Sequence, residues 1–488
     1  MTATSTGAAT GAYQAFKVEQ RGIELVPDDL RPMRPPQLFW LWAGAIFNVE
    51  FLIYGVLLVS PDVFGLSFGQ AVFTILVGNL AYAFLGVASL QGPETGTTAF
   101  GVSRAPFGRN GNRVVSTFNW LTQVGFEVLG LVLIVQAVEA MFARGGVGVG
   151  DALRAVVIVA AVGLQVVIPF LGHATITRVL RLLSYVFIVL FVVMAVLVVP
   201  HVHLGHVHQH GSWQQVSTAL VLVISAGGLG WTENGNDYSR YLPRRTPKAH
   251  TFLAAFLGAA IPSVLLELLG AAAVIVAPKI TSVTGLPLSA VPLAGVPQSF
   301  ASWFFWPFLL FALPQLFAIN TLDLYSSGVT LQAMGVRVPR WGAVLIDTVV
   351  AGAATFLVVF KGNFANDLQQ FLDYIVIWLG PWFGVLATDW LLRRGRYDLG
   401  ALAAERGGLY WRRGGVHWPA LIAQAAGMVV ATLWIFGKYY SPSYVGVISS
   451  ATGGSDFSWA AGIVVGAAVY ALLAGAGVRR EAAATAAP

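Results

Sequence analysis

Charged residues make up only 10% of this chain of 488 residues, whereas hydrophobic residues make up 57% and the mean hydropathy is +0.73. A composition this apolar excludes an ordinary water-soluble enzyme and indicates a protein with many membrane-spanning segments. The formal net charge is +6, but basic patches interleaved with aromatic residues are missing, so the sequence predicts no nucleic-acid partner. Cysteine is absent, which excludes disulfides and thiolate metal sites.

Taken in chain order, residues 1–34 are mostly small and polar and predict a disordered cytoplasmic tail. Twelve apolar segments follow, each with at least the roughly 20 residues that cross a hydrocarbon core about 30 Å thick. Residues 479–488 predict a second cytoplasmic tail. The predicted spans are 37–60, 68–92, 114–143, 151–172, 177–200, 214–236, 248–277, 300–334, 341–360, 368–392, 417–437 and 457–478.

Charge placement supports this count. If the N-terminus is cytoplasmic, 23 of the 28 lysines and arginines lie in inside segments, and a wrong number of spans would scramble that alternation. We therefore expect twelve transmembrane helices in the cytoplasmic membrane of the cell, with both termini in the cytoplasm. The basic residues left outside are Arg144, Arg154, Lys279, Lys361 and Lys438.

An outer loop after the fifth span holds five of the eight histidines. Alternating histidines can bind zinc or copper, but these lack a fixed scaffold and a carboxylate or thiolate partner. We expect a solvated loop and no metal site. The histidines of the loop are His201, His203, His206, His208 and His210.

The sixth span changes character before it ends, in the stretch GLGWTENGND. Its glycines mark a place where the helical ladder can open, and freed backbone groups are tolerable in a membrane only inside protein or facing a water-filled cavity. We expect a broken helix that lines a substrate site, with Trp231 as a stacking face and Glu233 and Asn234 as polar contacts. The alternative is that the helix ends near Ala226 and the polar run is its solvated cap.

Other spans carry polar residues that are costly in a membrane. In the eighth span Pro314 interrupts the helix, and Asn320 and Asp323 share one helical face. An acidic residue in a span usually serves transport or proton movement, although it can also pair with a buried arginine or hydroxyl. Asp323, Glu127 of the third span and Glu50 of the first are therefore candidates for ion or proton coupling.

A polar interruption beside glycine occurs in the first span, as AGAIFNVEFLIYG, and again in the sixth, as AGGLGWTENG. The distance of five helices between them suggests two inverted repeats of five helices, with the ligand between them at mid-depth. The predicted organisation is a transporter core at 35–396, followed at 397–478 by a cytoplasmic loop and two accessory helices.

Three ordered motifs resemble the nucleobase:cation symporter family of cytosine, purine, uracil, allantoin, thiamine and hydantoin permeases. They are GPETGTTAFGVSRAPFGRNGN, DYSRYLPR and PWFGVLATDWLLRRGRYD, and the resemblance runs from about Pro36 to Tyr397. It implies an all-α polytopic membrane protein with a LeuT-type fold, which has five plus five inverted helices, here with two extra C-terminal helices. It also implies alternating access with a coupling ion.

The resemblance further implies a set of substrate-binding residues. Family members carry an aromatic residue on the third span and an amide four residues later, at the positions of Phe126 and Gly130, so the stacking surface survives and the amide is lost. Trp231 matches a family tryptophan and would form the other side of an aromatic sandwich around a planar heterocycle. Asp323 stands where the family has an asparagine.

The coupling ion follows from the same resemblance. Sodium-coupled relatives have a serine and a threonine where this chain has Phe317 and Ala318, which disfavours a sodium site of that kind. A buried carboxylate, such as Asp323 or Glu127, can load and release a proton instead. We expect a proton-coupled importer of a nucleobase such as cytosine or a purine, without a cofactor, and sodium coupling is the alternative.

Other functions remain open. The acidic residues also suit a cationic heterocycle such as thiamine. A channel would need a repeated filter sequence, and a membrane enzyme would need a motif such as HExxH or GxSxG, and the sequence has neither. A receptor derived from a transporter is compatible with the sequence. Apart from the heterocycle and the lipid bilayer, no obligate partner is evident.

Overall fold

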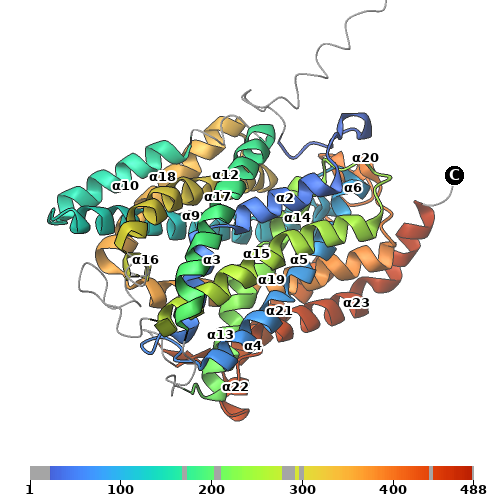
Figure 1. The fold of residues 1–488 in the computed structure, drawn as a ribbon. Coiled ribbons are helices and arrows are strands. Elements are labelled where there is room, and N and C mark those ends of the chain that lie inside the picture. Colours follow the sequence, from blue (N-terminus) through green and yellow to red (C-terminus); the bar gives the residue numbers. More distant parts are fainter. Residues whose placement is uncertain are drawn as a thin grey trace, which may run out of the picture.

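The structure is a computed structural model that describes residues 22–166, 173–202, 210–276, 292–295, 302–438 and 443–485. Over these residues the chain is mostly helical, and a short antiparallel ladder pairs β1 (Phe436–Gly437) with β2 (Tyr444–Val445). The long helices pack side by side in one bundle (Figure 1). They are α2 (Pro35–Ile46), α3 (Val49–Val59), α4 (Phe68–Asn79), α9 (Arg109–Arg144), α10 (Asp151–Gln165), α12 (His173–Val198), α13 (Trp213–Ile224), α15 (Lys248–Val276), α17 (Phe305–Ala333), α18 (Arg340–Lys361), α19 (Phe364–Arg393), α21 (Trp418–Trp434) and α23 (Ser458–Ala484).

Short helical pieces connect the long ones. The α-helical pieces are α5 (Tyr82–Ala88), α6 (Gln91–Thr95), α7 (Ala99–Val102), α8 (Arg104–Phe107), α14 (Gly235–Ser239), α16 (Pro292–Gly295), α20 (Leu399–Ala403) and α22 (Val447–Ala451). The tighter or wider turns are η2 (Asp28–Leu30), η3 (Val199–His201), η5 (Ser225–Leu229), η6 (Thr232–Asn234) and η8 (Ser302–Phe304).

The helices confirm a polytopic membrane protein. Among the described residues nine helices are long and apolar enough to cross a membrane, the bent pair α2 and α3 makes a tenth, and α21 is a shorter apolar helix. The predicted fourth span, 151–172, begins as α10 and continues into residues outside the described ranges. The count of twelve therefore stays a prediction.

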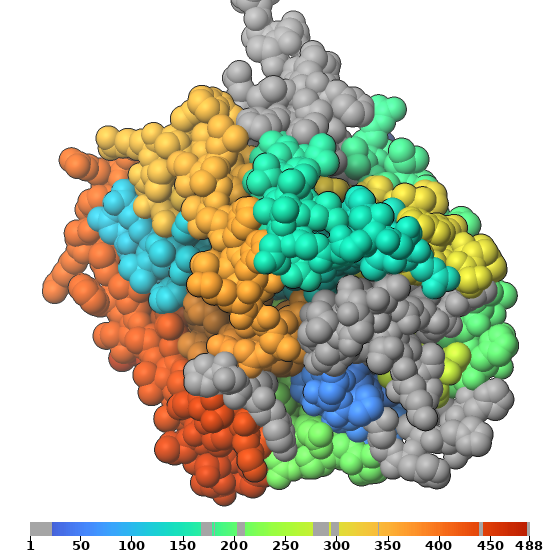
Figure 2. All heavy atoms as spheres, turned by 90° about the vertical axis from the view of Figure 1, so that its left-hand side faces the viewer, coloured from blue at the N-terminus to red at the C-terminus, as the bar shows by residue number. Residues whose placement is uncertain are grey.

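Burial separates central helices from peripheral ones. The most apolar window of the span 213–239 is 94% buried inside the protein, whereas that of the span 181–201 is only 22% buried. Large apolar side chains are exposed on the outer helices, among them Val156 of α10 and Val349 of α18. These two helices lie side by side on one face of the protein (Figure 2). A bilayer solvates such side chains, so these faces fit contact with lipid.

The first span is broken where the sequence predicts an interruption. The axes of α2 and α3 differ by 54°. Asn48 makes the break, because its side-chain oxygen accepts from the backbone N–H of Glu50 at 2.7 Å and its amide donates to the carbonyl of Ala45 at 2.7 Å. These bonds satisfy backbone groups that the broken helix leaves without intrahelical partners.

The sixth span is also interrupted. The α-helix α13 gives way at Ser225 to the π-helical turn η5, inside which Gly227 has the non-helical angles φ −98° and ψ −114°. The 3-10 turn η6 and the short helix α14 then complete the span. The stretch is buried throughout, so the alternative of a solvated cap near Ala226 is wrong.

Ordered structure extends into both predicted tails. Residues 22–34 pack on the protein, with Val26 and Met33 buried and the Arg31 guanidinium donating to the carbonyl of Pro93 at 2.8 Å, so the boundary predicted at residue 34 lies too far along the chain. At the other end α23 continues to Ala484, past the predicted boundary at 479, because the alanine-rich end has high helix propensity. Residues 1–21 and 486–488 lie outside the described ranges.

The accessory helices α21 and α23 pack against α19. A buried ion pair within α19 joins Arg393 Nε to Asp389 Oδ2 at 2.8 Å, and the Tyr470 hydroxyl of α23 donates to the other oxygen of Asp389 at 2.8 Å. The backbones of α19 and α23 approach closely at Gly384, where an added Cβ would collide with the carbonyl oxygen of Ile463.

The close approach of α19 and α23 gives a stability prediction. Gly384→Ala forces these helices apart, and overpacking of this kind costs about 1–3 kcal/mol, so we expect a lower apparent melting temperature of the purified protein. Gly477→Ala on α23 is the matched control, because a Cβ there meets no atom within 4 Å. Equal melting temperatures for the two variants would contradict the close packing at Gly384.

Candidate functional site

The two broken spans meet through aromatic side chains. Trp231 of the sixth span lies edge-to-face against Trp42 of α2, with ring centroids 5.9 Å apart. Trp42 meets Tyr238 of α14 in the same way at 5.6 Å. All three rings are buried. The interruptions therefore face protein and not lipid, as unpaired backbone groups in a membrane require.

Phe126 of α9 stacks on Trp231. Their ring centroids are 6.0 Å apart and their planes are inclined by 23°, so the two rings that were expected to form an aromatic sandwich do face one another. A planar heterocycle between them would need a ring spacing of about 7 Å, since each contact takes about 3.5 Å. The rings must therefore move apart to admit a ligand. Phe126 also meets Phe371 of α19 edge-on, with ring centroids 5.1 Å apart.

Gly130 lies one helical turn beyond Phe126 and acts through its lack of a side chain. An added Cβ would collide with the carboxamide of Asn320 on α17. The Asn320 amide donates to the backbone carbonyl of Glu127 and to Gln165 Oε1, at 3.2 Å each, while its Oδ1 is buried without a hydrogen-bond partner. The amide that α9 lacks is thus replaced in space by an amide from α17.

Glu233 and Asn234 are held by α9 through Gln123, which the sequence analysis missed. The Gln123 amide donates to Glu233 Oε1 at 3.1 Å and to Asn234 Oδ1 at 2.9 Å. Gln123 Oε1 and Glu233 Oε2 remain buried without partners. The sequence pattern that indicates Gln123 is the four-residue spacing of Asn119, Gln123 and Glu127. This spacing places three polar side chains on one face of a membrane helix.

Asp323 is buried in α17, and its Oδ1 has no hydrogen-bond partner. Its carboxyl group interacts electrostatically with those of Glu50, Glu233 and Asp347. None of these acids forms an ion pair with a basic side chain in the described part of the chain. The structure therefore gathers the predicted acids around one region, where they are not neutralised by arginine or lysine.

Glu267 of α15 is a buried acid with a structural role, in contrast to Asp323 and Glu233. Its two carboxyl oxygens accept hydrogen bonds, one from the Asn79 amide at 2.8 Å and one from the Ser263 hydroxyl at 3.0 Å. A buried carboxyl with both oxygens paired ties helices together. Asp323 and Glu233 each keep an oxygen that only a ligand or solvent can pair.

Glu127 faces a partner that the sequence analysis did not name, Asp347 of α18. Both are buried and their carboxyl groups interact directly. The Ser327 hydroxyl of α17 donates to Asp347. Two carboxylates have no hydrogen between them, so a hydrogen bond joining them requires one bound proton. Asp347 is the single acidic residue of the predicted ninth span, 341–360, and this feature of the sequence indicated it as a candidate.

The described residues contain no cluster of three or more His, Cys, Asp or Glu side chains that could hold a metal ion. Most of the histidine-rich loop, residues 203–209, lies outside those ranges. The prediction about that loop therefore stays a prediction.

The sequence match that decides the family covers most of the chain. Residues 25–462 match the family described as permeases for cytosine and purines, uracil, thiamine and allantoin. The chain belongs to this family. Among curated relatives, YxlA of Bacillus subtilis, named as a candidate purine-cytosine permease, is 26% identical over 483 residues, covering 94% of this chain and 96% of the relative. The purine-cytosine permease FCY2 of Saccharomyces cerevisiae is 23% identical over 484 residues, covering 94% of this chain and 86% of the relative.

Solved structures show the fold of this permease. Mhp1, a nucleobase-cation-symport-1 family transporter in a closed conformation with bromovinylhydantoin bound, matches with a TM-score of 0.69 and 19% identity, covering 97% of this chain and 96% of that one. The inward-facing form of Mhp1 matches with a TM-score of 0.64 and 19% identity, covering 96% of this chain and 99% of that one. The expected LeuT-type fold is therefore confirmed.

The contact between Gly130 and Asn320 gives a prediction about the site. Gly130→Ala displaces the Asn320 carboxamide, so we expect substrate affinity to fall by about tenfold, the size expected for a misplaced hydrogen-bonding group. Binding to the purified permease measures it. Gly111→Ala on the same helix is the control, because a Cβ there makes only ordinary contacts, beginning at 3.7 Å. Equal affinities for both variants would remove Asn320 from the site.

Proposed function

We propose that this permease is a secondary active transporter that imports a nucleobase, such as cytosine or a purine, by alternating access and proton symport. Both termini would lie in the cytoplasm. The observation that carries the proposal is the buried, stacked pair of Phe126 and Trp231, together with buried acceptor oxygens that have no partners. Its purine-cytosine permease relatives support the substrate class.

The buried acceptor oxygens without partners favour a substrate rich in N–H donors. Asp323 Oδ1, Glu233 Oε2 and Asn320 Oδ1 are buried without partners, and each unpaired group costs roughly 1–3 kcal/mol. A base such as cytosine carries an exocyclic amino group and a ring N–H, so it can donate to these oxygens while its faces stack on the rings.

A second candidate substrate is a cationic heterocycle such as thiamine. Five buried acids occupy the region without an ion-pair partner in the described chain, and a positive ring would neutralise part of that charge. The acids are Glu50, Glu127, Glu233, Asp323 and Asp347.

Proton coupling is favoured by the same acids. The sodium ligands expected from the resemblance are replaced by Phe317 and Ala318, which have no side-chain oxygen. Glu127 and Asp347 form a buried carboxyl pair that requires a proton for its hydrogen bond, and Asp323 lies near both. A proton taken up by this group from one side and released to the other would couple its movement to that of the substrate.

Substrate stacking predicts the effect of removing the indole. Stacking of a base on an aromatic ring is worth about 1–3 kcal/mol, so Trp231→Ala should weaken binding about tenfold or more while the permease still folds. The measurement is a thermal-shift screen of purified protein with cytosine, adenine, hypoxanthine, uracil, allantoin and thiamine, at two pH values, with and without sodium. Trp341→Ala is the control, because that indole is 55% exposed. Unchanged affinity in Trp231→Ala would reject the stacking site, and stabilisation by thiamine alone would favour the second candidate.

The carboxyl pair of Glu127 and Asp347 predicts that loss of one acid stops pH-driven accumulation of substrate but leaves substrate exchange intact. In proteoliposomes, Asp347→Asn should keep substrate exchange near the wild-type rate but lose pH-driven accumulation by about tenfold or more, because an amide cannot carry the proton. Asp323→Asn tests the neighbouring acid in the same way. Asp151→Asn, whose side chain is 79% exposed, is the control and should keep both activities. Full pH-driven accumulation in Asp347→Asn would remove Asp347 as a proton carrier.

A further inference from the structure

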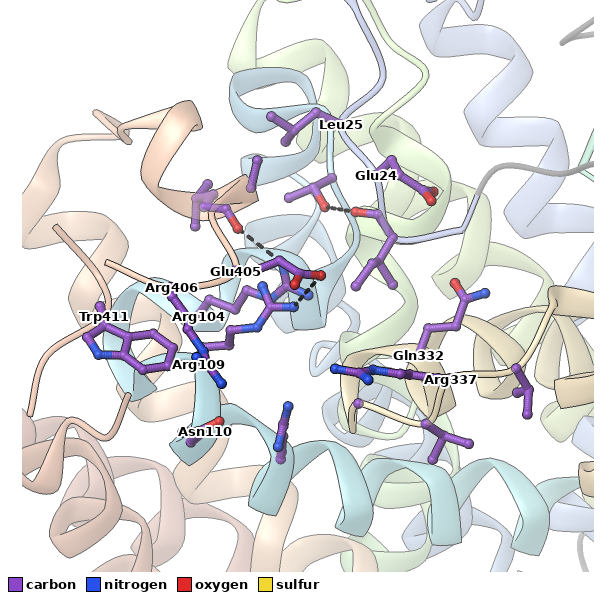
Figure 3. Close-up of a pocket in the computed structure, with 18 residues that line it drawn as sticks. Glu24, Leu25, Arg104, Arg109, Asn110, Gln332, Arg337, Glu405, Arg406 and Trp411 are labelled. Carbon is purple, nitrogen blue, oxygen red and sulfur yellow. Dashed lines mark hydrogen bonds and ion pairs between the residues drawn. The ribbon is translucent and has the colours of Figure 1, made fainter. Parts of the chain in front are cut away.

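Four segments from distant parts of the sequence enclose a second site, a cavity of about 620 Å³ at the predicted cytoplasmic end of the bundle (Figure 3). They are the N-terminal segment 23–25, the region from Thr97 to Arg113, the turn after α17 at 332–338, and the loop at 402–411. None of the residues proposed to bind the substrate or the proton lines this cavity. Its function is therefore a separate question from the transported substrate.

The walls of the cavity are strongly basic. Five arginines line it, against two glutamates, Glu24 and Glu405. Figure 3 shows Arg104 and Arg109 reaching in from one wall and Arg337 from the opposite wall. The two remaining lining arginines are Arg113 and Arg406.

Arg104 is the buried member of this group. Only 7% of the residue is exposed, its Nη1 donates to the carbonyl of Leu402 at 3.0 Å, and its Nε is buried without a partner. Burial, followed by the positive charge of Arg109, lowers the pKa of the Arg104 guanidinium to about 10. A buried guanidinium is ordinarily paired with an anion, and no carboxylate of the described chain lies within ion-pair distance of this one.

The other arginines are also largely unneutralised. Arg109 donates to the carbonyl of Ala404 at 3.0 Å and lies 3.7 Å from Glu405, whose side chain is 84% exposed, so that ion pair is weak. Arg113, Arg337 and Arg406 form no ion pair within the described ranges. The positive-inside rule accounts for arginines on this side of a membrane, but not for their convergence on one cavity with a buried, unpaired nitrogen.

The remaining lining residues add neutral contacts. Asn110 and Gln332 bring side-chain amides to the wall, and Trp411 brings a flat ring. A guanidinium binds phosphate through two parallel N–H groups, which makes clustered arginines the usual phosphate ligands. A volume of about 620 Å³ also falls within the range of small-molecule sites.

We propose that this cavity binds a phosphate-bearing anion, with Arg104, Arg109 and Arg337 around the phosphate and Trp411 against the organic part of the ligand. A soluble nucleoside monophosphate and the headgroup of an anionic phospholipid both supply this chemistry. The ligand would join α9 to α17 at one end, about 20 Å along α9 from Phe126 and about 13 Å along α17 from Asp323, at 1.5 Å per residue. Binding there would restrain the same two helices that carry the substrate site.

The experiment uses the full-length permease in nanodiscs and reads binding, so it does not depend on the transported substrate. In zwitterionic lipid, the dissociation constant of adenosine monophosphate is compared with that of adenosine, which has no phosphate. In a second series without nucleotide, the melting temperature is measured as an anionic phospholipid is added to the disc. Arg337→Gln with Arg406→Gln removes two exposed cavity arginines, and Arg245→Gln removes an exposed arginine that does not line the cavity.

The expected result is that the monophosphate binds and adenosine does not, and that binding is about tenfold or more weaker in the double variant and unchanged in Arg245→Gln. Stabilisation by the anionic lipid alone, lost in the double variant, supports the same site with a lipid as its source of phosphate. Three outcomes overturn the proposal: neither ligand acts, the double variant responds like the wild type, or Arg245→Gln loses as much as the double variant.

Discussion

The structure depends on one constraint, which is that lipid hydrocarbon offers a helix no hydrogen-bond partner. A span can break only where other parts of the protein cover it. The interruptions at Asn48 and at Gly227 satisfy this requirement, because both are buried and their aromatic neighbours Trp42 and Trp231 touch. The outer helices α10, α12 and α18, in contrast, expose apolar side chains.

The same constraint distinguishes acids that hold the fold from acids available for chemistry. Glu267 accepts hydrogen bonds from Asn79 of α4 and from Ser263 of its own helix. Asp389 pairs with Arg393 and accepts a hydrogen bond from Tyr470 of α23, so both acids join helices to each other. Asp323 has no such partner for Oδ1, and Glu127 faces the carboxyl group of Asp347. A buried acid without a fixed partner is costly, and binding of a substrate or a proton offsets that cost.

Two helices connect the substrate site of this permease with the basic cavity. The helices α9 and α17 carry Phe126 and Asp323 in their middle, and Arg113 and Gln332 at the end that lines the basic cavity. Each helix is continuous between these points. An anion bound in the cavity would restrain both helices and so act on the site, and by reciprocity a shift of either helix at the site would act on the cavity.

The sequence by itself determined the membrane class, the breaks in spans one and six, and candidates such as Trp231 and Asp323, because an apolar span makes each glycine-marked interruption and each acid conspicuous. The tertiary structure decided which of them meet. Only packing places Asn320 of α17 in the space that Gly130 leaves on α9, or sets Asp347 against Glu127. Periodicity within one helix reports which face a residue occupies, but the partner across an interface comes from helices far away in the sequence.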